Sequence, residues 1–67
     1  MADSAKLSEA IENRGVKKSF VAQQIGVSVS TFWRKMKGSS EFTLNEIRII
    51  AATLRLTDKE ICDIFFS

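Results

Sequence analysis

The chain has 67 residues, of which 45% are hydrophobic and 27% charged, and its formal net charge is +2. A chain of this length forms one small domain with a thin core, and self-association is a common way for such a domain to bury more surface. It has one cysteine and no histidine, which excludes an internal disulfide and leaves no basis for a zinc or haem site. The usual general base of a hydrolytic enzyme is also missing, so we expect no enzyme, no cofactor and no small-molecule ligand.

Two further features bear on location. No apolar run approaches the roughly 20 residues that a membrane span needs, and the N-terminal segment lacks the apolar stretch of a signal peptide. We therefore expect a reducing, cytoplasmic environment without membrane contact. Cys62 lies among apolar neighbours in the sequence, so we expect it in the core, with a redox or intermolecular-disulfide role as the alternative.

Helical spacing of apolar residues continues along the whole chain, and no proline interrupts it. Capping residues and glycines predict where the helices begin and end. We expect an all-α fold in which residues 1–67 form a single domain of five helices. The predicted helices run from Asp3 or Ser4 to just before Gly15, over 18–24, from Ser28 to 37, over 44–54 and from 58 to about 65.

The last two predicted helices each begin with the S/T-x-x-E pattern of a capping box, Thr43 with Glu46 and Thr57 with Glu60. The fourth helix carries an apolar stripe that we expect to face the core. Its members are Leu44, Ile47, Ile50, Ala51 and Leu54.

Charge is distributed unevenly along the chain. The segment between Asn13 and Ser40 contains six cations and no acid, whereas all eight Asp and Glu residues lie outside it. A helix pair inside a block of one charge sign indicates a polyanionic partner, with DNA as the leading candidate. The six cations are Arg14, Lys17, Lys18, Arg34, Lys35 and Lys37.

The third predicted helix has two distinct faces when it is projected at about 100° per residue. Phe32 and Met36 fall on one side and suit a core. Ser30, Arg34 and Lys37 fall opposite, which leaves that side for a partner. A B-form major groove is wide enough to admit such a helix.

Residues 18–37 resemble the helix-turn-helix of the lambda-repressor-like family, to which the Cro and cI types of phage repressor belong. The family expects a small fifth residue, a glycine at the ninth position and apolar residues at the fourth, eighth, tenth and fifteenth. The matching residues are Ala22, Gly26, Val21, Ile25, Val27 and Phe32. One helix before the pair and two after it also match the layout of the family.

The resemblance implies which residues contact DNA. The start of the third helix is expected to face base edges, and Lys18 and Ser28 resemble positions that touch phosphate. Other nearby cations suit backbone contacts because no acid is close to them in the sequence. The expected base-reading residues are Val29, Ser30, Trp33 and Arg34, and the expected phosphate-binding residues are Lys17, Lys18, Ser28, Lys35 and Lys37.

Each contact has a simpler alternative. Arg34 suits a guanine, but it also fits a solvated surface position. Trp33 either stacks beside the DNA backbone or covers the third helix. Lys35 departs from the family, which prefers an apolar residue there, and we expect Met36 to make that core contact instead.

The C-terminal apolar cluster has two interpretations. We expect at least Ile61 and Phe65 to cover the first and fourth helices, but two adjacent phenylalanines exceed what one helical face needs, and Ile64, Phe65 and Phe66 are the candidates for a contact between copies. They either complete the core or form a symmetric contact in a weak homodimer, which would read a palindromic operator.

The leading functional hypothesis is a sequence-specific regulator of transcription that binds double-stranded DNA, a Cro-like phage repressor acting in the cytoplasm of a bacterial host cell. A protein-interaction module of the same fold, such as an anti-repressor or antitoxin-like subunit, is the alternative. A DNA-binding domain cut from a longer repressor would have the same sequence features.

Overall fold

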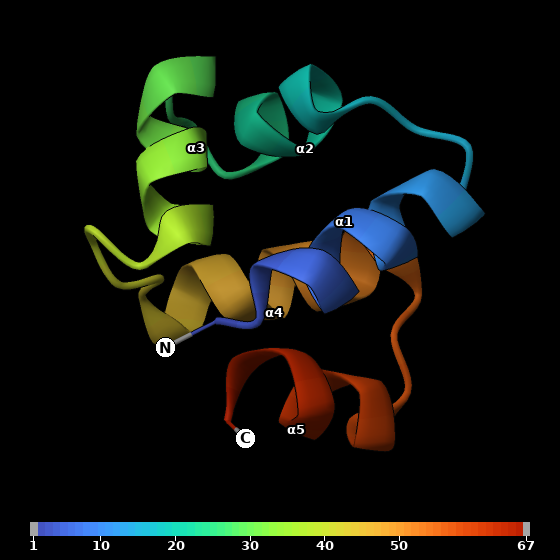
Figure 1. Ribbon diagram of the computed structural model, residues 1–67. Helices are drawn as coiled ribbons and strands as arrows, with labels where there is room; N and C mark the ends of the chain where they lie inside the picture. Colours follow the sequence, from blue (N-terminus) through green and yellow to red (C-terminus); the bar gives the residue numbers. More distant parts are fainter. Residues whose placement is uncertain (1, 67) are drawn as a thin grey trace.

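A computed structural model of the protein describes residues 2–66, and within that range it contains five α-helices and no strand. Figure 1 shows α3 standing at one edge of the molecule beside α2, with α5 at the far side from α2. The fold class and all five predicted helices are confirmed. The helices are α1 (Ser4–Asn13), α2 (Lys18–Gln24), α3 (Val29–Lys37), α4 (Leu44–Leu54) and α5 (Asp58–Phe65).

Four of the helices begin at a side-chain cap. Asp3, Ser28, Thr43 and Thr57 each accept a hydrogen bond from the backbone N–H three residues further on. This bond satisfies one of the donors that a helix start leaves unpaired. The two predicted capping boxes are both present, since the Glu46 and Glu60 side chains accept from the backbone N–H of their capping threonines.

Four helices end with one residue in the left-handed conformation, and three of them, α2, α3 and α4, also have the same pair of backbone hydrogen bonds around it. In α2, for example, the Val27 N–H donates to the Ala22 carbonyl and the Gly26 N–H to the Gln23 carbonyl, a Schellman arrangement. Gly15, Gly26 and Gly38 supply the positive φ after α1, α2 and α3. Arg55 supplies it after α4 with a φ of 53°, where glycine is the usual residue.

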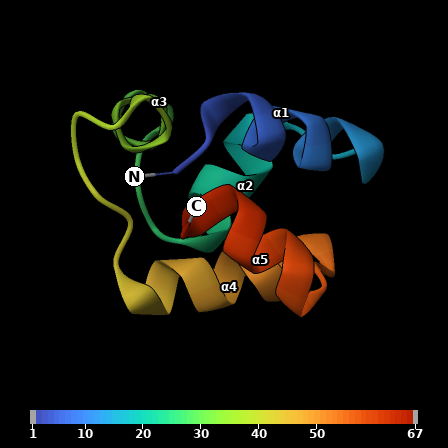
Figure 2. The ribbon, with the colours of Figure 1, turned by 60° about the horizontal axis from the view of Figure 1, so that its bottom comes forward.

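Every helix contributes to one core. α2 packs against α3 and α4, while α1 packs against α3 and α5. Figure 2, which looks along α3, shows α1 and α4 on different sides of the molecule with α2 and α5 between them. The buried apolar residues are Leu7, Ile11, Val21, Ala22, Phe32, Met36, Ile47, Ile50, Leu54, Ile64 and Phe65.

Two predicted core residues are on the surface instead. Leu44 is 60% exposed, because side chains on a helix tilt toward its N-terminus and Leu44 is the first residue of α4. Cys62 is also exposed. Its sequence neighbours are apolar, but it lies about 160° around α5 from the buried Ile64 and about 60° beyond the buried Phe65, so it falls outside the buried part of the helix surface.

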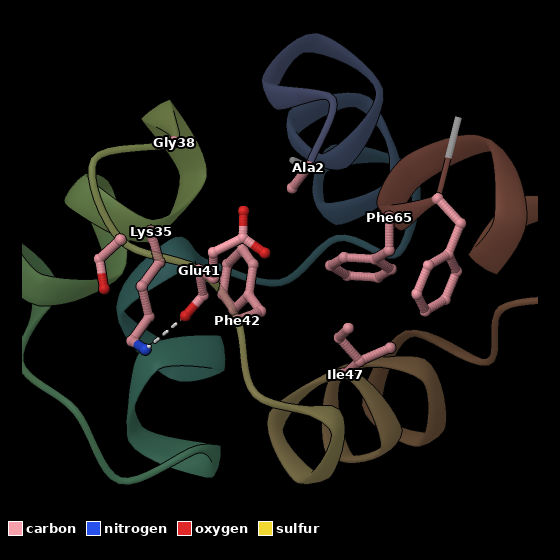
Figure 3. Close-up of a pocket in the computed structure, with 9 residues that line it drawn as sticks. Ala2, Lys35, Gly38, Glu41, Phe42, Ile47 and Phe65 are labelled. Carbon is pink, nitrogen blue, oxygen red and sulfur yellow. Dashed lines mark hydrogen bonds between the residues drawn. The ribbon is translucent and has the colours of Figure 1, made fainter.

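The C-terminal cluster divides between the core and the surface. Ile64 and Phe65 are buried in the core and have no surface to offer to a second copy, whereas Phe66 is 63% exposed. The Phe65 ring packs edge-on against Phe42, which in turn packs edge-on against Phe32. These contacts join the end of α5 to the loop between α3 and α4, and a pocket of about 330 Å³ lies at this junction (Figure 3).

Candidate nucleic-acid interface

Residues 18–37 form a helix-turn-helix whose inner side is apolar. Val21 and Ala22 of α2 and Phe32 and Met36 of α3 are all buried in the shared core. Ala22 is only 1% exposed, and Gly26, with a positive φ, allows the chain to turn after α2. The burial of Met36 confirms the prediction that it makes the core contact in the last turn of α3.

The outer face of α3 carries all four residues that were predicted to read bases. Val29 is 43% exposed and Trp33 is 41% exposed, and Ser30 and Arg34 are exposed as well. Counted from Val29, the other three residues follow after one, four and five positions, which places all four on one side of the helix. Lys37 extends that side by another turn. We call these five residues the α3 outer face.

Trp33 connects this face to the start of α2. The ammonium nitrogens of Lys18 and Lys37 each lie 5.3 Å from the centroid of the Trp33 ring. The first residue of α2 and the last residue of α3 thus meet at one side chain. The spacing of Trp33 and Lys37 along one helix could be read from the sequence, but the approach of Lys18 depends on how the two helices cross.

Ser28 has the structural role that was predicted for it. Its hydroxyl oxygen accepts from the Thr31 N–H at 3.1 Å, and the hydroxyl donates to the Thr31 side-chain oxygen at 3.0 Å. A contact between this hydroxyl and a phosphate would therefore replace an existing hydrogen bond. Lys17, the capping residue of α2, is exposed.

Lys35 differs from the expectation that no acid is near it. Its ammonium nitrogen lies 3.0 Å from a carboxylate oxygen of Glu46 and donates to the Glu41 carbonyl oxygen at 3.1 Å (Figure 3). The two side chains of the pair are only 11% and 13% exposed. Lys35 is thus largely buried against α4, and Glu46 neutralises its charge there.

The environment of Glu46 strengthens this ion pair. Partial burial by itself raises the pKa of Glu46, but the hydrogen bonds from the Thr43 N–H and the Lys35 ammonium outweigh it. The pKa therefore lies below the ordinary value of 4.5, and the carboxylate is charged at neutral pH.

Arg14 also has a partner within the fold. Its guanidinium donates to the Leu54 carbonyl through Nε and to the Arg55 carbonyl, at 3.0 Å, through Nη2. It thereby caps the C-terminal end of α4. Of the six cations in the acid-free segment, Arg14 and Lys35 are held by other parts of the chain. Of the remaining four, Lys18, Arg34 and Lys37 lie on the helix-turn-helix and Lys17 directly precedes it.

The α3 outer face forms, together with Lys17 and Lys18, a surface suited to a polyanion. The positive charges come from both helices, and the face between them offers an arginine fork, a hydroxyl and two apolar side chains.

None of the helices within residues 2–66 has the length and apolar character of a membrane span.

Comparison with known proteins gives one match. The model of the BetR domain family matches residues 6–64, which reach from α1 to α5. The searches against curated proteins and against solved structures found no match. A BetR domain with an all-helical fold fits a small regulatory domain of the DNA-binding kind. The match spans most of the sequence, and the chain therefore belongs to the BetR domain family.

Proposed function

We propose that this protein is a sequence-specific regulator of transcription, a Cro-like repressor that inserts α3 into the major groove of double-stranded DNA. The observation that carries the proposal is the α3 outer face, where the predicted base-reading residues are exposed together beside the three lysines Lys17, Lys18 and Lys37. The proposal depends on several side chains of one helix face together, and not on a helix end or a single basic residue. A helix that presents both hydrogen-bonding and apolar groups has what base edges require.

Each exposed residue suits a particular contact. The Arg34 guanidinium can bond the O6 and N7 atoms of one guanine together, and Val29 can contact a thymine methyl group. Ser30 bonds almost any base edge and so discriminates weakly. Lys17, Lys18 and Lys37 are assigned to phosphates, where they set affinity rather than sequence preference. Lys35 is left out of this set because Glu46 already neutralises it.

We further propose that the protein reads a palindromic operator as a weak dimer on DNA. Dimeric helix-turn-helix proteins read two half-sites about one DNA turn apart. Phe66 is the exposed member of the C-terminal cluster and is the residue we assign to the contact between copies. An operator overlapping a promoter would make such a protein a repressor.

Selection of bound sequences from a random pool of duplex DNA tests the proposal. We expect an enriched sequence with two inverted half-sites and an affinity that falls steeply with salt. Each phosphate neutralised contributes about −0.9 to the slope of log affinity against log salt concentration. Recovery of no preferred sequence, together with a flat salt dependence, would contradict DNA binding as the function.

Arg34→Ala tests the assignment of base reading. We expect a loss of about 1–3 kcal/mol in binding to the selected sequence and a relaxed preference at one base pair. Gel-shift titrations on the selected site and on single-base variants measure both effects. Lys17→Ala is the matched control, since it should weaken binding to all sequences alike. An equal loss on every sequence for Arg34→Ala would move Arg34 to the phosphate set.

The exposure of Leu44 and Phe66 supports the alternative function, a protein-interaction module. A contact built on these two apolar side chains would change little with salt, because it buries apolar area rather than releasing counterions. The same salt titration, with a candidate protein partner in place of DNA, separates the two functions.

A further inference from the structure

Trp33 is the side chain where the two ends of the helix-turn-helix meet. Lys18 begins α2 and Lys37 ends α3, and both ammonium nitrogens lie 5.3 Å from the centroid of its ring. The ring itself is 41% exposed and is not part of the buried core. It is thus at the surface, in contact with two of the cations that remain on the helix-turn-helix.

The contact is favourable on physical grounds. A cation within about 6 Å of an aromatic centroid is attracted by the electron-rich ring face, and tryptophan has the strongest attraction of the aromatic residues. The ring also offsets part of the repulsion between the two lysines. An ammonium has three N–H donors, so a lysine held by the ring keeps donors for a phosphate oxygen.

We propose that Trp33 is a positioning residue that holds Lys18 and Lys37 ready for the DNA backbone, rather than a reader of base edges. This inference rests on the proposed function and deepens it. Long lysine side chains lose rotamer freedom when they bind, at a cost of about 0.5–1.5 kcal/mol each. A ring that restricts them beforehand lowers that cost, and it does so for any DNA sequence.

Three roles for Trp33 therefore make different predictions. A base reader changes the preferred sequence when it is replaced. A residue that only covers α3 changes stability and leaves the contribution of each lysine intact. A positioning residue leaves the preferred sequence unchanged and makes the contributions of Lys18 and Lys37 depend on the ring.

Double-mutant cycles on random-sequence duplex DNA test the inference. Lys18→Ala and Lys37→Ala are measured in the wild-type protein and again in a Trp33→Leu background, with Lys17→Ala as the matched control. We expect Trp33→Leu to lower affinity on random and selected DNA alike. The loss of DNA affinity caused by Lys18→Ala, and that caused by Lys37→Ala, should be about twofold to fivefold smaller in the Leu background. The cost of Lys17→Ala should be the same in both backgrounds.

Four accompanying measurements keep the result unambiguous. Trp33→Phe retains an aromatic ring and should restore part of the lost affinity, and thermal unfolding shows whether each variant is folded.

Spectroscopy tests the contact directly. In NMR spectra recorded before DNA is added, the ring current of Trp33 should shift the ε-methylene protons of Lys18 and Lys37 upfield of those of Lys17, and Trp33→Leu should remove that shift. Trp33 is the single tryptophan and the chain has no tyrosine, so intrinsic fluorescence reports on this site as DNA binds.

The outcomes are separable. Equal costs for Lys18→Ala in both backgrounds, with DNA binding intact, would overturn the role of Trp33 and leave the proposed function standing. A changed sequence preference in Trp33→Leu would return Trp33 to base reading. If the wild-type protein binds no duplex DNA at all, the proposed function and this inference are both overturned.

Discussion

Arg14 and Lys35 show how misleading a count of charges along a sequence can be. Both belong to the acid-free segment, yet Arg14 bonds to carbonyl groups at the end of α4 and Lys35 pairs with Glu46 at its start. Each basic side chain secures one end of the same helix. The charge available to a partner is therefore smaller than the sequence implies, and it is concentrated on the helix-turn-helix.

Arg14→Lys should destabilise the fold without weakening DNA binding by the folded protein. Lysine lacks the fork that bonds two carbonyl groups at once, so at least one hydrogen bond to a charged donor is lost. We expect a loss of about 1–2 kcal/mol in the free energy of unfolding, measured by urea denaturation. The exposed Lys17, replaced by alanine, should change stability by less than about 0.5 kcal/mol. A reduced affinity of folded Arg14→Lys for DNA would show that Arg14 belongs to the interface.

Residue environments were predictable where the signal was local. The capping role of Ser28 and the positive φ of Gly26 follow from residue type and neighbouring pattern. The pairing of Lys35 with Glu46 was missed because it depends on where two helices meet in space. Cys62 was misplaced for a related reason, since proximity in sequence does not place a residue on the same side of a helix.

At the scale of whole helices, the shared type of C-terminal ending is the most regular feature of the fold. α2, α3 and α4 each stop at a residue in the left-handed conformation, which lets two backbone N–H groups satisfy carbonyl groups of the last turn. Glycine marked two of these ends in the sequence. The third was predicted from the apolar pattern of α4 alone, because Arg55 carries no signal for a turn.

Gly26→Ala should destabilise the protein by about 1 kcal/mol. A Cβ atom at Gly26 would meet nothing within 4 Å, so the cost is conformational: φ is +76° there. Thermal or urea unfolding measures the effect. Arg55→Gly is the reciprocal change at an equivalent position and should be neutral or slightly stabilising. An unchanged stability for Gly26→Ala would show that the turn can adopt another conformation.

For the molecule as a whole, the ionised carboxylates link stability to pH. The pKa of Glu60, like that of Glu46, lies below 4.5, here because the backbone N–H and the hydroxyl of Thr57 both donate to it. Two helix starts thus depend on charged glutamates. In the unfolded chain the same groups bind protons more readily, so stability should rise with pH through the acid range.

We expect the free energy of unfolding to be nearly constant above about pH 5 and to fall as pH drops below 4.5 through the lowered pKa values. Urea denaturation at pH 7, 4.5 and 3 measures this. Glu46→Gln keeps an acceptor for the Thr43 N–H but loses the charge that pairs with Lys35. The difference in stability between wild type and Glu46→Gln should be present at pH 7 and shrink toward pH 3. A difference that is constant with pH would show that the charge of Glu46 contributes nothing.

The backbone bond between the Asp3 N–H and the Ile64 carbonyl, 2.6 Å long, has a consequence for how the protein folds during synthesis. It joins the residue that caps α1 to the last turn of α5, so α1 gains this partner only after α5 has been synthesised. The helix-turn-helix and α4, by contrast, involve contacts between segments made one after another. Contacts between distant segments form late because closing a long loop costs entropy. The DNA-facing helices are therefore expected to assemble first, and the pairing of α1 with α5 to complete the fold.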